Sequence, residues 1–239
     1  MASALEIENV SYAYGNKTAL QDVSFTAAAG SFTALLGPNG AGKSTLFSLL
    51  SCLFVPQAGT LSVMGYSLAK SPRAALAHMG IVFQQPTLDL DLTIKRNLYY
   101  FAALQGLSAR KARARIEEAL DRLDIRDRAD EQVRKLNGGH RRRAELARAL
   151  IHQPKVLLRD EPTVGLDAPS RRSITDHAHA LADQGLCVLW ATHLVDEVAP
   201  GDQVLVLHRG QVLAHERCDR LCGDEPLAER FRSLTGAAA

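Results

Sequence analysis

Hydrophobic positions follow two different periods along the chain, and their order predicts its elements. In the first 85 residues, short apolar or alternating runs indicate strands. These runs are 5–10, 19–26, 31–36, 60–64 and 80–83. A turn signal at Gly15-Asn16 lies between the first two runs and predicts an antiparallel pair. Residues 45–50 have helical spacing instead.

The pattern changes between residues 91 and 152, where apolar residues recur at helical spacing and no β-branched run interrupts them. Ser108 has the side chain of an N-cap for a basic amphipathic helix over 109–123. After Pro154, apolar runs return and alternate with helical stretches, as in βαβ units. These runs are 155–158, 185–191 and 203–207.

This order predicts an α/β fold with a mostly parallel sheet, an N-terminal antiparallel β subdomain and an inserted α-helical subdomain. We expect a single domain over residues 1–239. Its catalytic core, which includes the antiparallel subdomain, is expected at 1–85 and 154–220. The helical subdomain is expected at 86–153, and a C-terminal helix with a tail at 221–239.

Composition narrows the classes of protein to which the chain can belong. Of its 239 residues, 46% are hydrophobic and 23% charged, and the formal net charge of +2 argues against a broad nucleic-acid-binding surface. No apolar run approaches the roughly 18 residues of a membrane span. The N-terminus lacks the features of a secretion signal, so we expect a cytoplasmic protein. The four cysteines do not complete a zinc pattern and are expected to be free thiols.

A glycine-rich loop joins the apolar run at 31–36 to the helical segment after it, and its sequence fits the P-loop pattern G-x-x-x-x-G-K-[S/T]. Its candidate phosphate-binding residues are Gly37, Pro38, Asn39, Gly40, Ala41, Gly42, Lys43, Ser44 and Thr45. Glycines let consecutive N–H groups turn towards a phosphate, Lys43 supplies a positive charge, and the Ser44 hydroxyl can bind Mg²⁺. The alternative, a glycine-rich turn before an ordinary helix, requires both the pattern and its flanks to be accidental. The sequence therefore predicts a P-loop NTPase core.

Two carboxylates end the apolar run that begins at Lys155. This is the Walker B arrangement, in which a buried strand brings Asp160 beside the P-loop to hold Mg²⁺. Glu161 would then orient and deprotonate the attacking water. The alternative is an acidic strand end near the surface, but the P-loop upstream favours the catalytic interpretation.

A third motif, Asn137-Gly138-Gly139, leads directly into a helical segment. Arginines occupy positions 141–143 in its first turn, where the helix dipole disfavours cations by about 0.3–1 kcal/mol each. Either a nearby anion relieves this conflict or the arginines form a solvated basic face.

The order of these motifs, with His193 downstream, resembles the ATP-binding subunit of an ABC transporter, and the match covers almost the whole chain. The resemblance implies that Tyr14 stacks on adenine and that Gln84 senses the γ-phosphate, with Gln85 as a near rival. It places Gln84 with Ser44 and Asp160 among the Mg²⁺ ligands. It also makes Asn137-Gly138-Gly139 the signature loop, Asp167 the carboxylate at the dimer interface and His193 the switch histidine. Lys43, Glu161 and His193 would be the catalytic residues.

The resemblance further implies an ATPase that works as a head-to-tail pair, with a second copy or a related subunit closing over each ATP. A separate transmembrane permease would receive the motion, which places the chain at the inner face of the cell membrane. The segment after Gln85 resembles exporter ATPases, and the run from Leu136 to Arg143 resembles subunits associated with pyrroloquinoline-quinone-dependent alcohol oxidation. The alternatives are a soluble ABC-type ATPase without a transporter and a catalytically weak regulatory subunit.

Three residues depart from the family pattern. The signature loop usually reads Leu-Ser-Gly-Gly-Gln, but Asn137 and His140 occupy the serine and glutamine positions here. Arg159 occupies a position, directly before Asp160, that is usually apolar. Because neighbouring strand residues face opposite ways, we expect Arg159 to face the helices and either to pair with a carboxylate or to extend to solvent.

His177 and His179 are two apart on a helical segment, so we expect surface positions and no shared metal.

Overall fold

The computed structural model of the chain describes residues 3–161, 163 and 165–236. Its strands are β1 (Ser3–Tyr14), β2 (Lys17–Ala28), β3 (Phe32–Leu36), β4 (Ala58–Val63), β5 (Tyr66–Ser67), β6 (Met79–Val82), β7 (Val156–Asp160), β8 (Cys187–Thr192), β9 (Gln203–His208) and β10 (Gln211–Arg217). Its α-helices are α1 (Lys43–Leu50), α2 (Pro72–Ala77), α3 (Ile94–Leu104), α4 (Ala109–Arg122), α5 (Gly138–Leu150), α6 (Ala168–Asp183), α7 (Cys218–Cys222) and α8 (Leu227–Thr235). Short 3-10 helices cover 126–128, 133–135 and 195–197.

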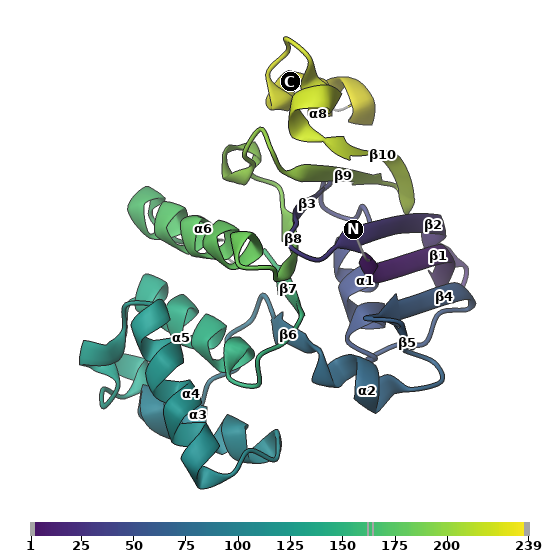
Figure 1. Cartoon of the computed structure of the whole chain (residues 1–239). Coiled ribbons are helices and arrows are strands. Elements are labelled where there is room, and N and C mark those ends of the chain that lie inside the picture. The colour runs from purple at the N-terminus through teal and green to yellow at the C-terminus, as the bar shows by residue number, and fades with distance from the viewer. Residues whose placement is uncertain (1–2, 162, 164, 237–239) are drawn as a thin grey trace.

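A six-stranded sheet in the order β10-β9-β3-β8-β7-β6 forms the centre of the molecule (Figure 1). Each pairing from β9 to β6 is parallel, and only β10 runs antiparallel to its neighbour. Every residue of β3, β7 and β8 is buried, as expected for parallel strands that are covered on both faces. The predicted α/β fold with a mostly parallel sheet is therefore confirmed.

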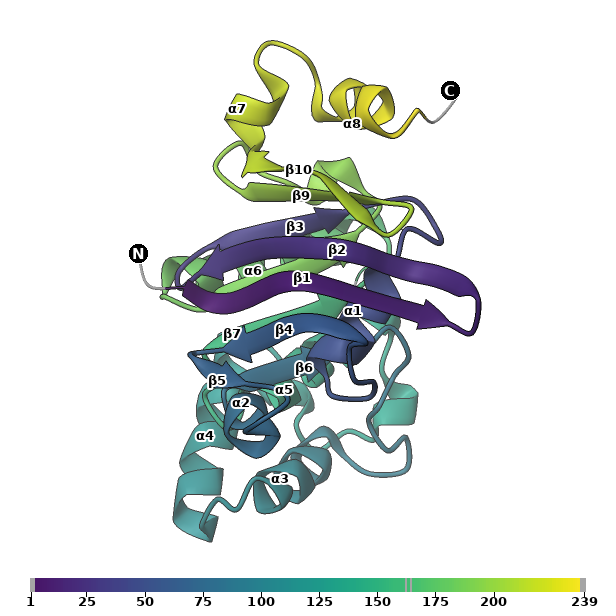
Figure 2. The same ribbon diagram turned by 90° about the vertical axis from the view of Figure 1, so that its right-hand side faces the viewer.

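A second, four-stranded sheet has the order β2-β1-β4-β5 and is antiparallel (Figure 2). The turn between β1 and β2 lies at the predicted place, and Gly15 there has a φ of +57°. Such an angle favours glycine because other residues crowd their own Cβ in this conformation. The predicted antiparallel β subdomain is thus present.

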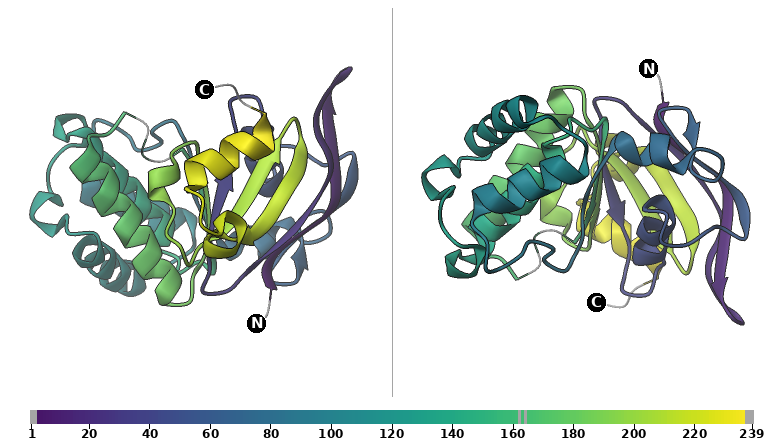
Figure 3. Two further views of the ribbon diagram at one scale, coloured as in Figure 1. Left: turned by 90° about the horizontal axis from the view of Figure 1, so that it is seen from above. Right: turned by 90° about the horizontal axis from the view of Figure 1, so that it is seen from below.

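The two faces of the central sheet are covered by different elements (Figure 3). On one face, α1 and the antiparallel sheet pack against strand residues such as Leu35, Leu158 and Leu189. On the other face, helices α3 to α6 pack against residues such as Leu157 and Trp190. Neighbouring positions of β7 therefore face different layers, so the direction of each side chain follows from strand alternation.

Polar side chains cap two helices of the segment between the strands. The predicted cap Ser108 accepts a hydrogen bond from the Lys111 backbone N–H at 3.5 Å at the start of α4. Thr93 caps α3 in the same way, through the Arg96 N–H at 3.2 Å. The helices in the described part of the chain lack the combination of length and hydropathy that a membrane-spanning segment requires.

Candidate functional site

Four loops that carry predicted site residues leave the central sheet at the same edge. The strands β3, β8, β7 and β6 are parallel neighbours, so their carboxyl ends meet there. The P-loop follows β3, His193 follows β8, Glu161 follows β7 and Gln84 follows β6. Sheet topology alone therefore brings together residues that are more than a hundred positions apart in sequence.

The P-loop wraps around the side chain of Lys43. The Lys43 ammonium donates to the Gly37 carbonyl at 2.6 Å and to the Pro38 carbonyl at 3.3 Å. Burial lowers its pKa, and the charges of Glu161 and Asp160 oppose that shift. Gly42 has a φ of +111°, and a Cβ there would lie 2.7 Å from the Ala19 carbonyl oxygen. The loop thus holds an ammonium and the N-terminus of α1 at one point, an arrangement suited to a phosphate.

A cavity of about 320 Å³ opens above this loop. Its lining is formed by Tyr14, Lys17, Thr18, Ala19, Asn39, Gly40, Ala41, Gly42, Lys43, Ser44, Thr45, Gln84 and Glu161. Lys17, Thr18 and Ala19 were not predicted as site residues. They arrive at the cavity because they begin β2, and the turn at Gly15 that places them is a signal in the sequence.

Glu161 is in contact with three other predicted site residues. Its carboxylate lies 3.7 Å from the Lys43 ammonium and 3.6 Å from Nδ1 of His193, and it accepts a hydrogen bond from the Gln84 amide at 3.4 Å. Glu161 has a φ of +44°, an uncommon value for a residue with a side chain. Strain of this kind costs about 1–3 kcal/mol and persists where surrounding structure fixes it, commonly at functional sites.

Asp160, at the end of β7, lies beside Ser44 at the start of α1. Burial raises the pKa of Asp160, although Ser44 and Lys43 oppose the shift. Its Oδ1 is buried and accepts no hydrogen bond from any described residue. A buried oxygen of this kind, next to a hydroxyl, fits a hard cation or one of its bound waters.

Tyr14 stands at the open rim of the same cavity. Tyr14 is 48% exposed, and its hydroxyl lies 3.4 Å from that of Thr45. Tyr12 and Phe54 pack edge-on against it, with ring centroids 5.1 and 5.8 Å away. An exposed ring held in place by other rings leaves a face to which an aromatic base could stack.

The motif at 137–139 and Asp167 lie elsewhere, at the starts of α5 and α6 on the other face of the sheet (Figure 1). The Asn137 side-chain oxygen caps α5 by accepting from the His140 N–H at 2.9 Å, which leaves its amide group as a donor. Asp167 caps α6 through the Ser170 N–H at 2.7 Å. A Cβ on Gly139 would lie 2.9 Å from the Ser170 hydroxyl, so the two helix starts are closely packed. Neither motif lines the 320 Å³ cavity.

Comparisons with known proteins agree with this geometry. The family described as "ABC transporter" matches residues 20–164. The chain is 38% identical over 220 residues to the daunorubicin resistance ATP-binding protein DrrA3 of Streptomyces coeruleorubidus, covering 92% of this chain and 70% of that protein. It is 37% identical to the Nod factor export ATP-binding protein I of Paraburkholderia xenovorans, covering 92% and 67%.

The chain belongs to the ABC transporter family. It is an ATP-binding subunit and its enzymatic class is ATPase. Two solved structures extend the likeness to nearly the full fold. An ATP-binding subunit of an ABC transporter has a TM-score of 0.86 at 27% identity, with 97% of this chain and 99% of that chain covered. The dimeric cassette MJ0796 bound to ADP and Pi has a TM-score of 0.78 at 27% identity, with 90% and 98% covered.

The arginines at the start of α5 reveal a contact of this ABC ATPase that the sequence did not predict. Arg142 is buried and donates to the carbonyls of Phe83, at 3.2 Å, and Gln84, at 2.5 Å. It also pairs with Glu145 at 2.8 Å. The unfavourable interaction of Arg142 with the helix dipole is thus offset by a protein carboxylate and two carbonyls. Neither of the two expected explanations, a bound anion or a solvent-exposed basic face, applies to Arg142.

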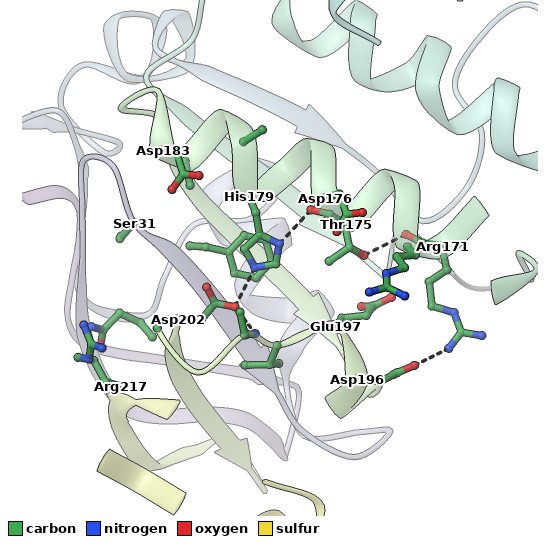
Figure 4. Close-up of a pocket in the computed structure, with 18 of the residues that line it drawn as sticks. Ser31, Arg171, Thr175, Asp176, His179, Asp183, Asp196, Glu197, Asp202 and Arg217 are labelled. Carbon is green, nitrogen blue, oxygen red and sulfur yellow. Dashed lines mark hydrogen bonds and ion pairs between the residues drawn. The ribbon is translucent and has the colours of Figure 1, made fainter. Parts of the chain in front are cut away.

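A larger cavity, of about 1010 Å³, lies away from the P-loop, between α6 and the segment that leads into β9 (Figure 4). On its wall, His179 stacks on Phe32 with ring centroids 4.0 Å apart and binds Asp202 at 2.8 Å. The surface position expected for His179 is therefore wrong, because these contacts half-bury its ring. No group of three or more potential metal-binding side chains occurs among residues 3–161, 163 and 165–236.

The expectation that Arg159 pairs with a carboxylate or reaches solvent is also wrong. Arg159 faces the helical layer as expected, but it is fully buried, and its three side-chain nitrogens find no hydrogen-bond acceptor in the described part of the chain. Its guanidinium instead lies over the Trp190 ring, 4.9 Å from the centroid. The four cysteines are free, as predicted.

Proposed function

We propose that this ABC ATPase hydrolyses Mg·ATP at the P-loop cavity, with Glu161 as the base that activates water and His193 as the γ-phosphate switch. The single observation that carries these roles is the contact of Glu161 with Lys43, His193 and Gln84. A carboxylate beside an ammonium and an imidazole, at the mouth of a phosphate loop, can accept a proton next to a transferring phosphoryl group.

Lys43 and the P-loop amides are placed to neutralise charge on the phosphates, and Tyr14 is placed to stack on the adenine. Asp160 and Ser44 fit Mg²⁺ because one Asp160 oxygen is buried and without a donor while the Ser44 hydroxyl lies beside it. Gln84 would complete this set from the adjacent loop. Held by these residues, the metal would offset negative charge on the phosphates.

The site of one chain is incomplete, which supports a head-to-tail pair. Asn137-Gly138-Gly139 offers a helix N-terminus and an amide donor, yet it lies outside the cavity of its own chain. In a pair, the corresponding loop of a second copy or related subunit would close over the γ-phosphate, with Asp167 near the interface. The dimeric cassette MJ0796 supports this arrangement.

A separate transmembrane permease is the proposed receiver of the motion, and export is the proposed direction. Relatives whose names refer to daunorubicin resistance and Nod factor export support this direction. The chain would then act at the inner face of the cell membrane. The resemblance to subunits of pyrroloquinoline-quinone-dependent systems stays a prediction. The helical segment 86–153 is proposed as the part that moves, because Arg142 of α5 holds the Gln84 loop.

The test is steady-state Mg·ATP hydrolysis by the purified chain and by Glu161→Gln, with ATP-dependent dimerisation followed by size. Glu229→Gln, at an exposed position of α8, is the matched control. We expect Glu161→Gln to lose hydrolysis and to accumulate as an ATP-bound dimer, while Glu229→Gln behaves as the parent. Full activity in Glu161→Gln would contradict the role of Glu161, and the absence of a dimer would contradict the pairing.

A further inference from the structure

Four buried side chains form a cluster directly behind the proposed catalytic pair. Arg159 precedes Asp160, and Thr163 lies two residues after Glu161. Trp190 and Glu197 flank His193 on its strand and on the segment that follows it. All four are at most 3% exposed. The cluster faces the helical layer, so it does not reach ATP, but each member is covalently close to a residue that does.

Trp190 is in contact with a cation on one side and an anion on another. The Arg159 guanidinium lies over its ring face, and its Nε1–H donates to the Glu197 carboxylate at 2.9 Å. The other Glu197 oxygen accepts from the Thr163 hydroxyl. Both of these donors are neutral, and the indole that carries one of them has the Arg159 cation on its face.

The two charges support each other through the ring. A cation over an indole face attracts π-electron density, which makes the N–H edge a stronger donor to a carboxylate. The Arg159 guanidinium is positively charged, as arginine is in proteins, so this cluster together with the Arg142–Glu145 pair has no net charge.

An apolar side chain in place of Arg159 would fill the same space at lower cost, because an isolated buried charge is destabilising and buried ion pairs are often replaced without loss. Space-filling alone therefore does not explain the guanidinium. Its charge has an effect only through the groups around it, and among these Glu197 holds the two segments that carry Glu161 and His193.

We propose that Arg159, Trp190 and Glu197 form a buried charge relay that fixes the loops of Glu161 and His193 relative to each other, which makes Arg159 a positioning residue for ATP hydrolysis. This proposal rests on the catalytic roles proposed above for Glu161 and His193. Without the Arg159 charge, Glu197 would be a lone buried anion beside the 1010 Å³ cavity that it lines (Figure 4). It would turn to water there and release Thr163 and Trp190.

The test is a double-mutant cycle with Arg159→Met, Glu197→Gln and the double variant, in the full chain. We expect each single variant to lower kcat for Mg·ATP at least about 10-fold with KM changed less than about 2-fold, because orientation is lost while ATP contacts remain. The double variant removes both charges and is expected to recover to within about 3-fold of the parent. Arg159→Lys, which keeps the charge, is expected to retain more kcat than Arg159→Met. Arg232→Met, at an exposed position, is the control for the substitution itself.

Stability gives a second readout that does not depend on hydrolysis. Trp190 is the single tryptophan of the chain, so its fluorescence during urea unfolding reports on the cluster itself. Each single variant is expected to unfold at lower urea than the double variant. Additive losses in kcat or in stability would overturn the relay, as would a KM effect that accounts for the loss in kcat/KM. If the unsubstituted chain does not hydrolyse ATP, the proposed function is contradicted. The urea-unfolding cycle would still test the coupling between Arg159 and Glu197 in that case.

Discussion

The three consecutive arginines of α5 provide a sharp test of how the Gln84 loop is held. Arg142→Met removes the donor to the Phe83 and Gln84 carbonyls and the partner of Glu145. The Glu145 side chain is 0% exposed and, among the described residues, would keep only the Thr87 N–H as a donor, at 2.9 Å. The substitution therefore leaves a buried carboxylate without its cation, while a methionine still fills most of the space.

The expected loss follows from these contacts. Breaking a buried ion pair on one side costs about 3–5 kcal/mol. For a chain of this size, 1 kcal/mol corresponds to a Tm change of about 2–4 °C, so Arg142→Met is expected to lower the Tm by about 6–20 °C. The neighbouring Arg143 is 20% exposed; it pairs at 3.7 Å with Asp124, which is 91% exposed, and donates to the Asp124 carbonyl at 3.3 Å and the Ser173 hydroxyl at 3.0 Å. A pair with an exposed partner contributes about 0–1 kcal/mol and its loss leaves no buried charge, so Arg143→Met should lower Tm less than Arg142→Met.

The assay is thermal and urea unfolding of both variants without nucleotide, followed by hydrolysis at a temperature where both are folded. Arg142→Met is also expected to lower kcat, because the Gln84 loop loses its anchor, whereas Arg143→Met should not. The double variant Arg142→Met, Glu145→Gln should recover part of the stability by removing the lone charge. Equal losses in Arg142→Met and Arg143→Met would refute the reasoning.

Three further predictions concern groups around the site. Gly40→Ala and Gly42→Ala both place a side chain at positive φ, which costs about 1–2 kcal/mol of stability. Only at Gly42 would the Cβ also collide with Ala19 and Leu20. Without nucleotide, Gly42→Ala should therefore unfold at a lower urea concentration than Gly40→Ala. Burial raises the pKa of Asp160, so ionisation of its carboxyl group opposes folding. Asp160→Asn should therefore stabilise the nucleotide-free chain at about pH 7.5, and this gain should disappear in acid, where Asp160 is protonated. The same substitution should abolish hydrolysis. Burial lowers the pKa of His179 but Asp202 outweighs it, so the net pKa lies above the ordinary 6.5. Its stabilisation is full below 6.5 and disappears as pH rises through the raised value, so His179→Gln should cost more stability at about pH 6 than at about pH 8.5.

The elements that the sequence predicted share a local cause. Strands β3 and β8 are apolar at nearly every position, and β7 is apolar up to Leu158, because both faces of the sheet are covered. Helix α4 has both a serine cap and an apolar stripe. Motifs next to such strands can be placed with little further information, since parallel strands end at the same edge. Lys43, Asp160 and Glu161 were predicted together from their motifs, the resemblance to ABC subunits added His193, and the four lie together at that edge.

The elements that were missed depend on their surroundings. The helix α2 has six residues and buries only Ala75, so it presents no apolar stripe. The strand β10 alternates exposed and half-buried positions, and it exists because a turn at Arg209-Gly210, with φ values of +48° and +78°, folds it back onto β9. The contacts of Arg142 and Arg159 could not be predicted because Phe83, Gln84 and Trp190 are far from them in sequence, on the loop after β6 and on β8.

These two arginines divide the loops of the site into two groups with different anchors. Arg142 belongs to α5 and holds the Gln84 carbonyl, so the position of Gln84 follows the helical layer. Arg159 and Trp190 belong to β7 and β8, and through Glu197 they hold the segments next to Glu161 and His193. A displacement of α5 against the sheet would therefore carry Gln84 away from Glu161 while leaving Glu161 and His193 together. Gln84 is thus the member of the site that can report on the helical layer, and the 3.4 Å contact between its amide and Glu161 is where that motion would meet the chemistry.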